Sequence, residues 1–122
     1  ALSTAQIRSD LELLRTAGFG MVRVFDAKVA DKTVAAIVQA PALDMKVMMG
    51  VWIASTVLTD PNTKLPDATK NTANAALNDA EITLAVRLAN AHPDVIKAIS
   101  VGNETRKALR TWWPTCTAFA VR

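Results

Sequence analysis

The sequence predicts an α/β protein whose strands run parallel and are joined by helices. Apolar residues recur at helical spacing in three stretches, and each stretch is followed by a short apolar, β-branched run that is typical of a strand. Connections that contain a helix make successive strands pair in parallel with a right-handed crossover. The 122 residues are 51% hydrophobic and 20% charged, which is enough for a domain with a buried core.

The first predicted unit is a helix over residues 3–17 and a strand over residues 21–25. Ser3 and Gln6 have the spacing of a capping box, in which each side chain bonds the backbone N–H of the other residue. The strand ends at Asp26, for which we expect a capping or turn role. One face of the helix carries Ile7, Leu11 and Leu14.

The second predicted unit is a helix over residues 31–39, stopped by Pro41, and a strand over residues 46–53. This strand is apolar at successive positions rather than at alternate ones. A parallel strand covered on both faces has this pattern, so we expect the strand to be buried.

The third predicted unit starts with a long polar loop over residues 54–72. Asn78 then opens a helix that runs to about His92, with Glu81 as the capping partner of Asn78. The last strand spans residues 95–104 and ends in a carboxylate.

Two architectures fit this order of elements: an open doubly wound sheet, or part of a closed (β/α)₈ barrel. No strand is followed by a glycine-rich phosphate loop, which gives the open sheet no support.

Alternation along the strands sorts the candidate functional side chains by face. Glu104 shares the small-residue face of the last strand, and a carboxylate at the carboxyl end of a strand lies where barrel enzymes place catalytic groups. The same alternation groups Arg23 with Phe25 and Gly50 with Trp52. A carboxylate, a guanidinium and an indole would then converge on one mouth of a barrel.

Three segments, in this order, resemble glycoside hydrolase family 17. They are residues 22–25 (VRVF), 46–53 (KVMMGVWI) and 99–104 (ISVGNE), and the resemblance covers about residues 6–105. This family contains β-1,3-glucanases and glucanosyltransferases, and belongs to a retaining clan built on a (β/α)₈ barrel.

The resemblance implies a role for each candidate residue. Glu104 would be the catalytic general acid/base at the end of the fourth barrel strand, and Asn103 would contact the sugar near the cleaved bond. Arg23 would support the catalytic carboxylates, and Trp52 would line the sugar subsites. A β-glucan would be the substrate, with no cofactor and no metal. Phe25 lacks the hydroxyl that the family favours at its position.

Each candidate also has a purely structural interpretation. Glu104 could be a surface carboxylate or a helix cap, Arg23 a strut that pairs with Asp26 or Glu104, and Trp52 a core residue. At the level of the whole chain, the alternatives are a lectin-like protein that binds glucan without cleaving it, and a half-barrel that self-associates through open sheet edges.

The expected domain organisation is a partial barrel domain over residues 1–105 and an unassigned tail over residues 106–122. The tail has four basic and no acidic residues, a shift compatible with truncation or a change of reading frame. A full barrel takes about 250 residues, so the chain would hold about its first half. The resemblance places the nucleophilic carboxylate on the seventh strand, so we expect the isolated chain to be inactive.

Composition argues against several other classes of function. The net charge of +3 is spread along the chain, with no dense basic run for nucleic acid. Cys116 is the only cysteine, so no intramolecular disulfide can form. No His, Cys and carboxylate cluster has metal-ligand spacing, and no apolar run is long enough to span a membrane. The resemblance alone favours a secreted, periplasmic or cell-wall location.

Overall fold

The chain folds around a three-stranded parallel sheet. The computed structural model describes residues 3–102, in which helices and strands follow one another along the chain. Both strand pairs are parallel, in the spatial order β1-β2-β3. The elements are α1 (Thr4–Thr16), β1 (Met21–Val24), α2 (Ala27–Val38), the short 3₁₀ helix η1 (Pro41–Leu43), β2 (Lys46–Val51), α3 (Ala68–Ala91) and β3 (Ile96–Val101).

Helix α1 begins and ends as its sequence predicts. The backbone N–H of Gln6 donates to Ser3 Oγ at 3.2 Å, and the backbone N–H of Ser3 donates to Gln6 Oε1 at 3.0 Å, so the capping box is confirmed. Gly18 follows the last turn with φ of 95°, a conformation that glycine adopts without steric cost. Ile7 and Leu11 are the buried residues of the helix, which packs on α2.

The predicted start of the second helix was wrong, because α2 begins earlier, at Ala27. Asp26 caps it: Asp26 Oδ1 accepts a hydrogen bond from the backbone N–H of Val29 at 2.7 Å. Ala27 and Ala30 are fully buried, so the inward face of the helix starts with side chains that are too small to give a clear apolar period.

The predicted start of the third helix was also wrong, because α3 begins at Ala68, inside the stretch expected to be a loop. Asp67 is its N-cap and accepts from the backbone N–H of Lys70 at 3.0 Å. The inward stripe of α3 is apolar only in its second half, at Ala85 and Leu88. In its first half the half-buried positions are asparagines, so apolar periodicity marks only the later turns.

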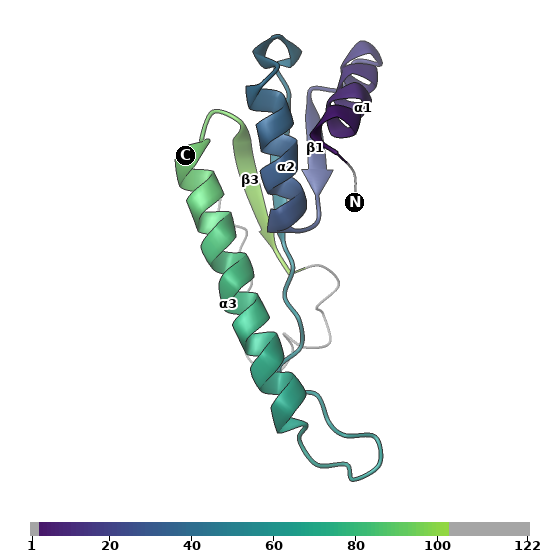
Figure 1. The fold of residues 1–122 in the computed structure, drawn as a ribbon, viewed down its shortest axis with the longest axis vertical. Coiled ribbons are helices and arrows are strands. Elements are labelled where there is room, and N and C mark those ends of the chain that lie inside the picture. The colour runs from purple at the N-terminus through teal and green to yellow at the C-terminus, as the bar shows by residue number, and fades with distance from the viewer. Residues whose placement is uncertain (1–2, 103–122) are drawn as a thin grey trace.

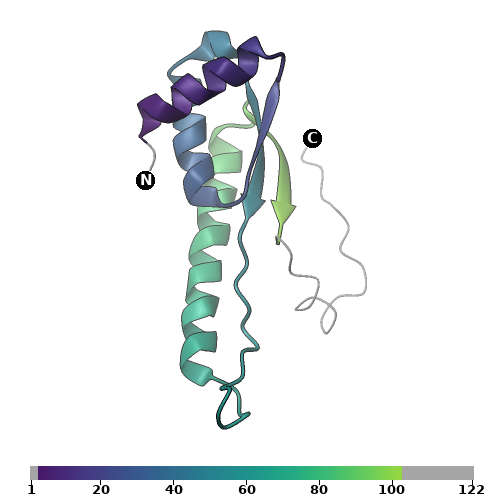
Figure 2. The ribbon, with the colours of Figure 1, turned by 90° about the vertical axis from the view of Figure 1, so that its right-hand side faces the viewer.

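Helices α2 and α3 cover one face of the sheet (Figures 1 and 2). On β2 the side chains of Val47, Met49 and Val51 are buried against them, and Met49 is completely inaccessible. Met48 points to the other face and is half-buried. The expectation that both faces of β2 are covered is therefore only half confirmed, since no described helix packs on the second face.

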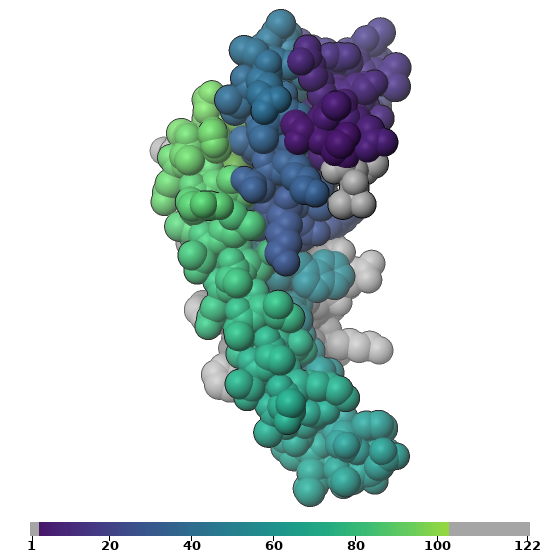
Figure 3. Space-filling view, in the orientation of Figure 1, coloured from purple at the N-terminus to yellow at the C-terminus, as the bar shows by residue number. Residues whose placement is uncertain are grey.

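Helix α3 is much longer than the strands beside it. It projects past their carboxyl ends, and the extended segment 52–58, which leaves β2, runs alongside it in both ribbon views (Figures 1 and 2). The space-filling view shows the first part of α3 and the loop before it as a projection below α2 (Figure 3). Within residues 3–102, no helix is long and apolar enough to cross a membrane.

The observed architecture confirms the predicted fold class: α/β, with parallel strands that alternate with helices, as in part of a (β/α)₈ barrel. Strands β1 and β3 are the outer strands of the described sheet. Self-association through their edges stays a prediction. Strand β3 ends at Val101, earlier than expected.

Candidate functional site

The carboxyl ends of all three strands meet at one edge of the sheet, as parallel pairing requires. Gly50 is in register with Ser100, and Val51 with Val101. The backbone N–H of Gly102 donates to the carbonyl of Val51 at 3.0 Å, which carries the pairing one residue past β3. The residues that follow the strands at this carboxyl edge are Phe25, Trp52 and Gly102.

Gly50 allows β1 and β2 to approach closely at the carboxyl edge. A Cβ atom at Gly50 would lie 2.6 Å from the backbone oxygen of Phe25 and 2.7 Å from that of Val24, closer than real Cβ atoms come. Both of these atoms belong to the main chain and cannot turn away. Only glycine therefore fits at this position of β2 without moving the end of β1.

Arg23 and Phe25 share a face of the sheet, as the alternation predicts. The guanidinium carbon of Arg23 lies 5.1 Å from the centroid of the Phe25 ring, which is cation–π geometry. The side chain of Arg23 is exposed, and in register it lies beside Met48 of β2. The support of catalytic carboxylates by Arg23 stays a prediction.

Trp52 is the first residue after β2, and its side chain is 49% exposed. The interpretation of Trp52 as a core residue is therefore wrong. Its backbone N–H donates to Glu81 Oε1 at 3.2 Å, so the position of the residue is set from α3 rather than by a strand partner. A half-exposed indole at the carboxyl edge can present an apolar ring face to a ligand.

Glu81 has a different role from the one expected. It is not the capping partner of Asn78, because both residues lie well inside α3. Its Oε1 accepts from the backbone N–H of Ala27 at 2.6 Å as well as from that of Trp52. Ala27 is the first residue of α2, where the N–H groups have no partner within the helix and the helix dipole favours negative charge. One carboxylate thus joins the start of α2 to the end of β2.

Three asparagines of α3 continue this arrangement along the segment 52–58. Asn78 bonds both backbone groups of Ala54: Oδ1 accepts from its N–H at 2.8 Å, and Nδ2 donates to its carbonyl at 2.9 Å. Asn71 bonds both groups of Leu58 in the same way, at 2.8 and 3.0 Å. A single bond, from Nδ2 of Asn74 to the carbonyl of Ser55, is 2.7 Å long.

Asn71, Asn74, Asn78 and Glu81 form what we call the α3 polar row. The predicted elements did not include this row, although the sequence carries a signal for it. The four positions follow one another at intervals of three, four and three residues, which places them on one helix face. The assignment of residues 54–72 to a loop concealed this pattern.

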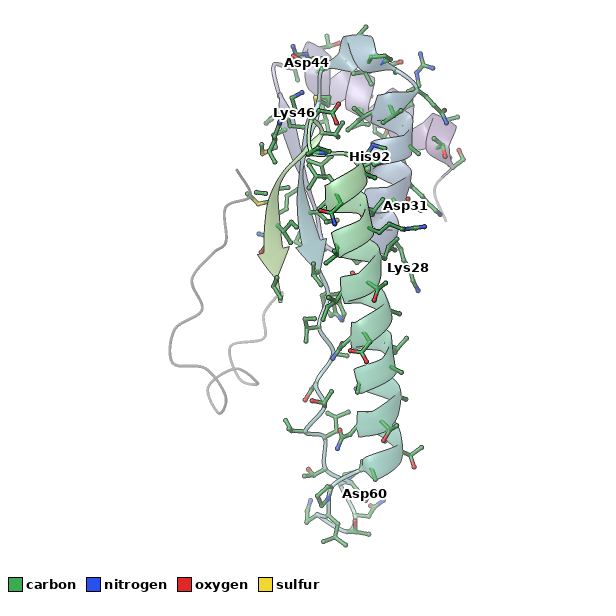
Figure 4. The ribbon with its side chains drawn as sticks, turned by 90° about the vertical axis from the view of Figure 1, so that its left-hand side faces the viewer. Lys28, Asp31, Asp44, Lys46, Asp60 and His92 are labelled. Carbon is green, nitrogen blue, oxygen red and sulfur yellow. The ribbon has the colours of Figure 1, made fainter. Side chains whose placement is uncertain are left out.

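Asn103 and Glu104 lie outside the described residues, so their predicted roles stay predictions. Four titratable side chains labelled in Figure 4 lie away from the carboxyl edge. Asp44, Lys46 and His92 are at the opposite end of the sheet, and Asp60 is in the projecting loop (Figure 4). Within residues 3–102, no three His, Cys, Asp or Glu side chains gather as a metal site.

The parallel strands, the helices between them and the shared carboxyl edge define an α/β fold of the kind found in part of a (β/α)₈ barrel. Among solved structures, the crystal structure of an endo-laminarinase from Formosa Hel1_33_131 is similar, with a TM-score of 0.63 and 26% sequence identity. The match covers 85% of this chain and 27% of that one, so this chain spans about a quarter of the enzyme. No family model and no curated protein match the sequence. The likeness supports a fold of the β-glucan hydrolase type.

Proposed function

We propose that this chain supplies the acid/base side of the active site of a retaining β-glucan hydrolase or glucanosyltransferase of glycoside hydrolase family 17. The observation that carries the proposal is the position of Glu104 in the sequence. It follows closely on β3, whose carboxyl end lies at the same edge as Trp52. Barrel enzymes place their catalytic groups at this edge. The likeness to an endo-laminarinase supports a β-1,3-glucan as the substrate.

In this proposal Glu104 first acts as an acid and then as a base. Its carboxyl group protonates the glycosidic oxygen as the sugar leaves, and its carboxylate then takes a proton from water or from an acceptor hydroxyl. Water as the acceptor gives hydrolysis, and a sugar hydroxyl gives glucanosyl transfer. A retaining mechanism also needs a nucleophilic carboxylate about 5–5.5 Å away. The family resemblance assigns it to the seventh strand of the barrel.

The remaining candidates would bind and orient the sugar. Trp52 would stack its half-exposed indole on a pyranose ring, and Asn103 would hydrogen-bond a hydroxyl near the cleaved bond. Arg23 would hold positive charge near the catalytic carboxylates. The proposed functional unit is the partial barrel domain of residues 1–105, and residues 106–122 have no assigned role.

The acid/base role is tested in a complete barrel that carries this sequence. Glu104→Gln is expected to lower laminarin hydrolysis by about 10²-fold or more, because the amide is far too weak an acid to protonate the leaving oxygen. A substrate with a good leaving group, such as an aryl glucoside, should lose less, since its departure needs no proton. Glu12→Gln is the matched control, because Glu12 is an exposed carboxylate on α1. Near-normal laminarin turnover by Glu104→Gln would remove it from this role.

A non-catalytic glucan-binding protein is the second candidate, and the exposure of Trp52 favours it. Calorimetry of the full chain with laminari-oligosaccharides separates the two candidates. Pure binding is supported if the chain binds saturably and Trp52→Ala weakens that binding. In addition, a complete barrel that carries this sequence should release no new reducing ends from the glucan. Absence of heat at any concentration rejects binding by this chain.

A further inference from the structure

The α3 polar row lies alongside the segment 52–58 and bonds its backbone at both ends and in the middle. Trp52 is bonded by Glu81, Ala54 by Asn78 and Leu58 by Asn71, so helix and segment run antiparallel. From the first to the last member of the row the helix rises about 15 Å. A fully extended chain of residues 52–58 would span about 20 Å, and the segment bends at Thr56 between these contacts.

These contacts satisfy backbone groups that none of the described strands bonds. Strand β2 ends at Val51, and the segment after it leaves the sheet. The side-chain amides of Asn78 and Asn71 offer one acceptor and one donor each, which is the pair of groups that an extended residue presents on one edge. The row therefore takes the place of a neighbouring strand.

Glu81 differs from the three asparagines in charge and in its partners. It presents a carboxylate to two N–H donors, one of which belongs to the first turn of α2, where negative charge is stabilised. Hydrogen bonds to an ionised acceptor are about twice as strong as neutral ones. Through Glu81, the backbone of Trp52 is linked to both α3 and α2 at the point where the chain leaves the sheet.

We propose that Glu81 is a positioning residue, which sets the place of the Trp52 indole at the carboxyl edge so that the indole can bind a β-glucan. The binding part of this inference rests on the proposed function. Glu81 acts through the main chain and touches no sugar. Loss of its Oε1 acceptor would release the backbone of Trp52 and allow the indole to move away from the carboxyl edge.

The first test follows Trp52 without any ligand. Trp112→Phe and Trp113→Phe leave Trp52 as the one tryptophan of the chain. In this background, Glu81→Ala is expected to shift the emission of Trp52 and to increase its quenching by acrylamide, while Glu81→Gln, which keeps the Oε1 acceptor, should restore the parent values. Asn71→Ala is the matched control, because it breaks two bonds of the same row far from Trp52 and should leave the emission unchanged.

The second test uses laminari-oligosaccharides and calorimetry on the full chain. We expect Trp52→Ala and Glu81→Ala each to raise Kd by about tenfold or more, and Glu81→Gln and Asn71→Ala to stay within about threefold of the parent. If Glu81→Ala does not fold, Glu81→Asp replaces it, because a carboxylate one methylene shorter cannot reach both donors.

The outcomes separate the inference from the proposed function. Parent-like emission, quenching and affinity in Glu81→Ala would overturn the positioning role. An equal change in Asn71→Ala would overturn it too, because general loosening of α3 would then explain the effect. If the parent chain binds no oligosaccharide, the glucan-binding function fails, and the fluorescence of Trp52 still decides whether Glu81 positions it.

Discussion

Asn78 bonds Ala54 through both atoms of its amide, with the backbone N–H of Ala54 at 2.8 Å and its carbonyl at 2.9 Å. The side chain of a helical residue thus makes the two backbone hydrogen bonds that a neighbouring strand would make in a sheet. The pair lies in the middle of the α3 polar row, where no strand among residues 3–102 lies beside the segment after β2.

Asn78→Ala should destabilise the chain by about 1 to 3 kcal/mol, because it leaves two partly buried backbone groups without partners. The better helix propensity of alanine offsets about 0.5 kcal/mol of this loss. Urea unfolding measures the difference. Leu77→Ala, next to it on the helix and 59% exposed, is the control and should change stability by less than about 0.5 kcal/mol. Equal stabilities for the two variants would show that the row contributes nothing to folding.

Gly50→Ala should cost about 1 to 3 kcal/mol, because the new methyl group meets backbone atoms of Phe25 and Val24 at the carboxyl edge. Thermal unfolding checks the loss. Gly20→Ala is the control, because its methyl group would meet only the Arg15 side chain, at an ordinary 3.6 Å. A Gly50→Ala variant as stable as Gly20→Ala would mean that β1 and β2 lie farther apart than described here.

Truncation of a β2 side chain to alanine should cost more stability on one face of the sheet than on the other. Met49→Ala removes a completely buried side chain beneath the helices and should cost about 2 to 5 kcal/mol. Met48→Ala, its neighbour on the half-buried face, should cost clearly less. Denaturant unfolding of both variants provides the comparison, and a larger loss for Met48→Ala would contradict the assignment of the two faces.

Asp67 gives the start of α3 a dependence on pH. The backbone N–H of Lys70, followed by its ammonium group, lowers the pKa of the Asp67 carboxyl below the ordinary 3.8. A lowered pKa in the folded chain means that Asp67 contributes its stabilisation above pH 3.8, and that this is lost as the pH falls through the folded pKa.

Asp67→Asn keeps a side-chain cap and removes the charge. The stability advantage of the parent over this variant should be full near neutral pH and should disappear in strong acid. Urea unfolding at a series of pH values tests this. An advantage that persists unchanged into strong acid would contradict the lowered pKa.

Local sequence signals predicted most of the fold because the groups that determine it lie close together in the chain. Ser3 and Gln6 form the expected capping box within one turn. The order of parallel strands followed from connections that are long enough for helices. The amino-terminal ends of α2 and α3 were misplaced, because alanines or amides occupy the inward face there and no apolar period is visible. Strand β3 also ends at Val101, earlier than predicted.

The candidate site was less predictable because its contacts join distant parts of the chain. Glu81 meets Ala27 and Trp52 across two connections, and the local pattern favoured a cap for Asn78 instead. Gly50 has no local feature that marks its approach to Phe25. Alternation within a strand did place Arg23 with Phe25, since that relationship depends on β1 alone.

The α3 polar row bonds main-chain atoms of Ala54, Ser55 and Leu58 and makes no demand on their side chains. Substitutions within that segment can therefore accumulate without altering its path, provided that the asparagines remain. The side chains of this segment, beside the carboxyl edge, can in this way diversify while its scaffold stays constant.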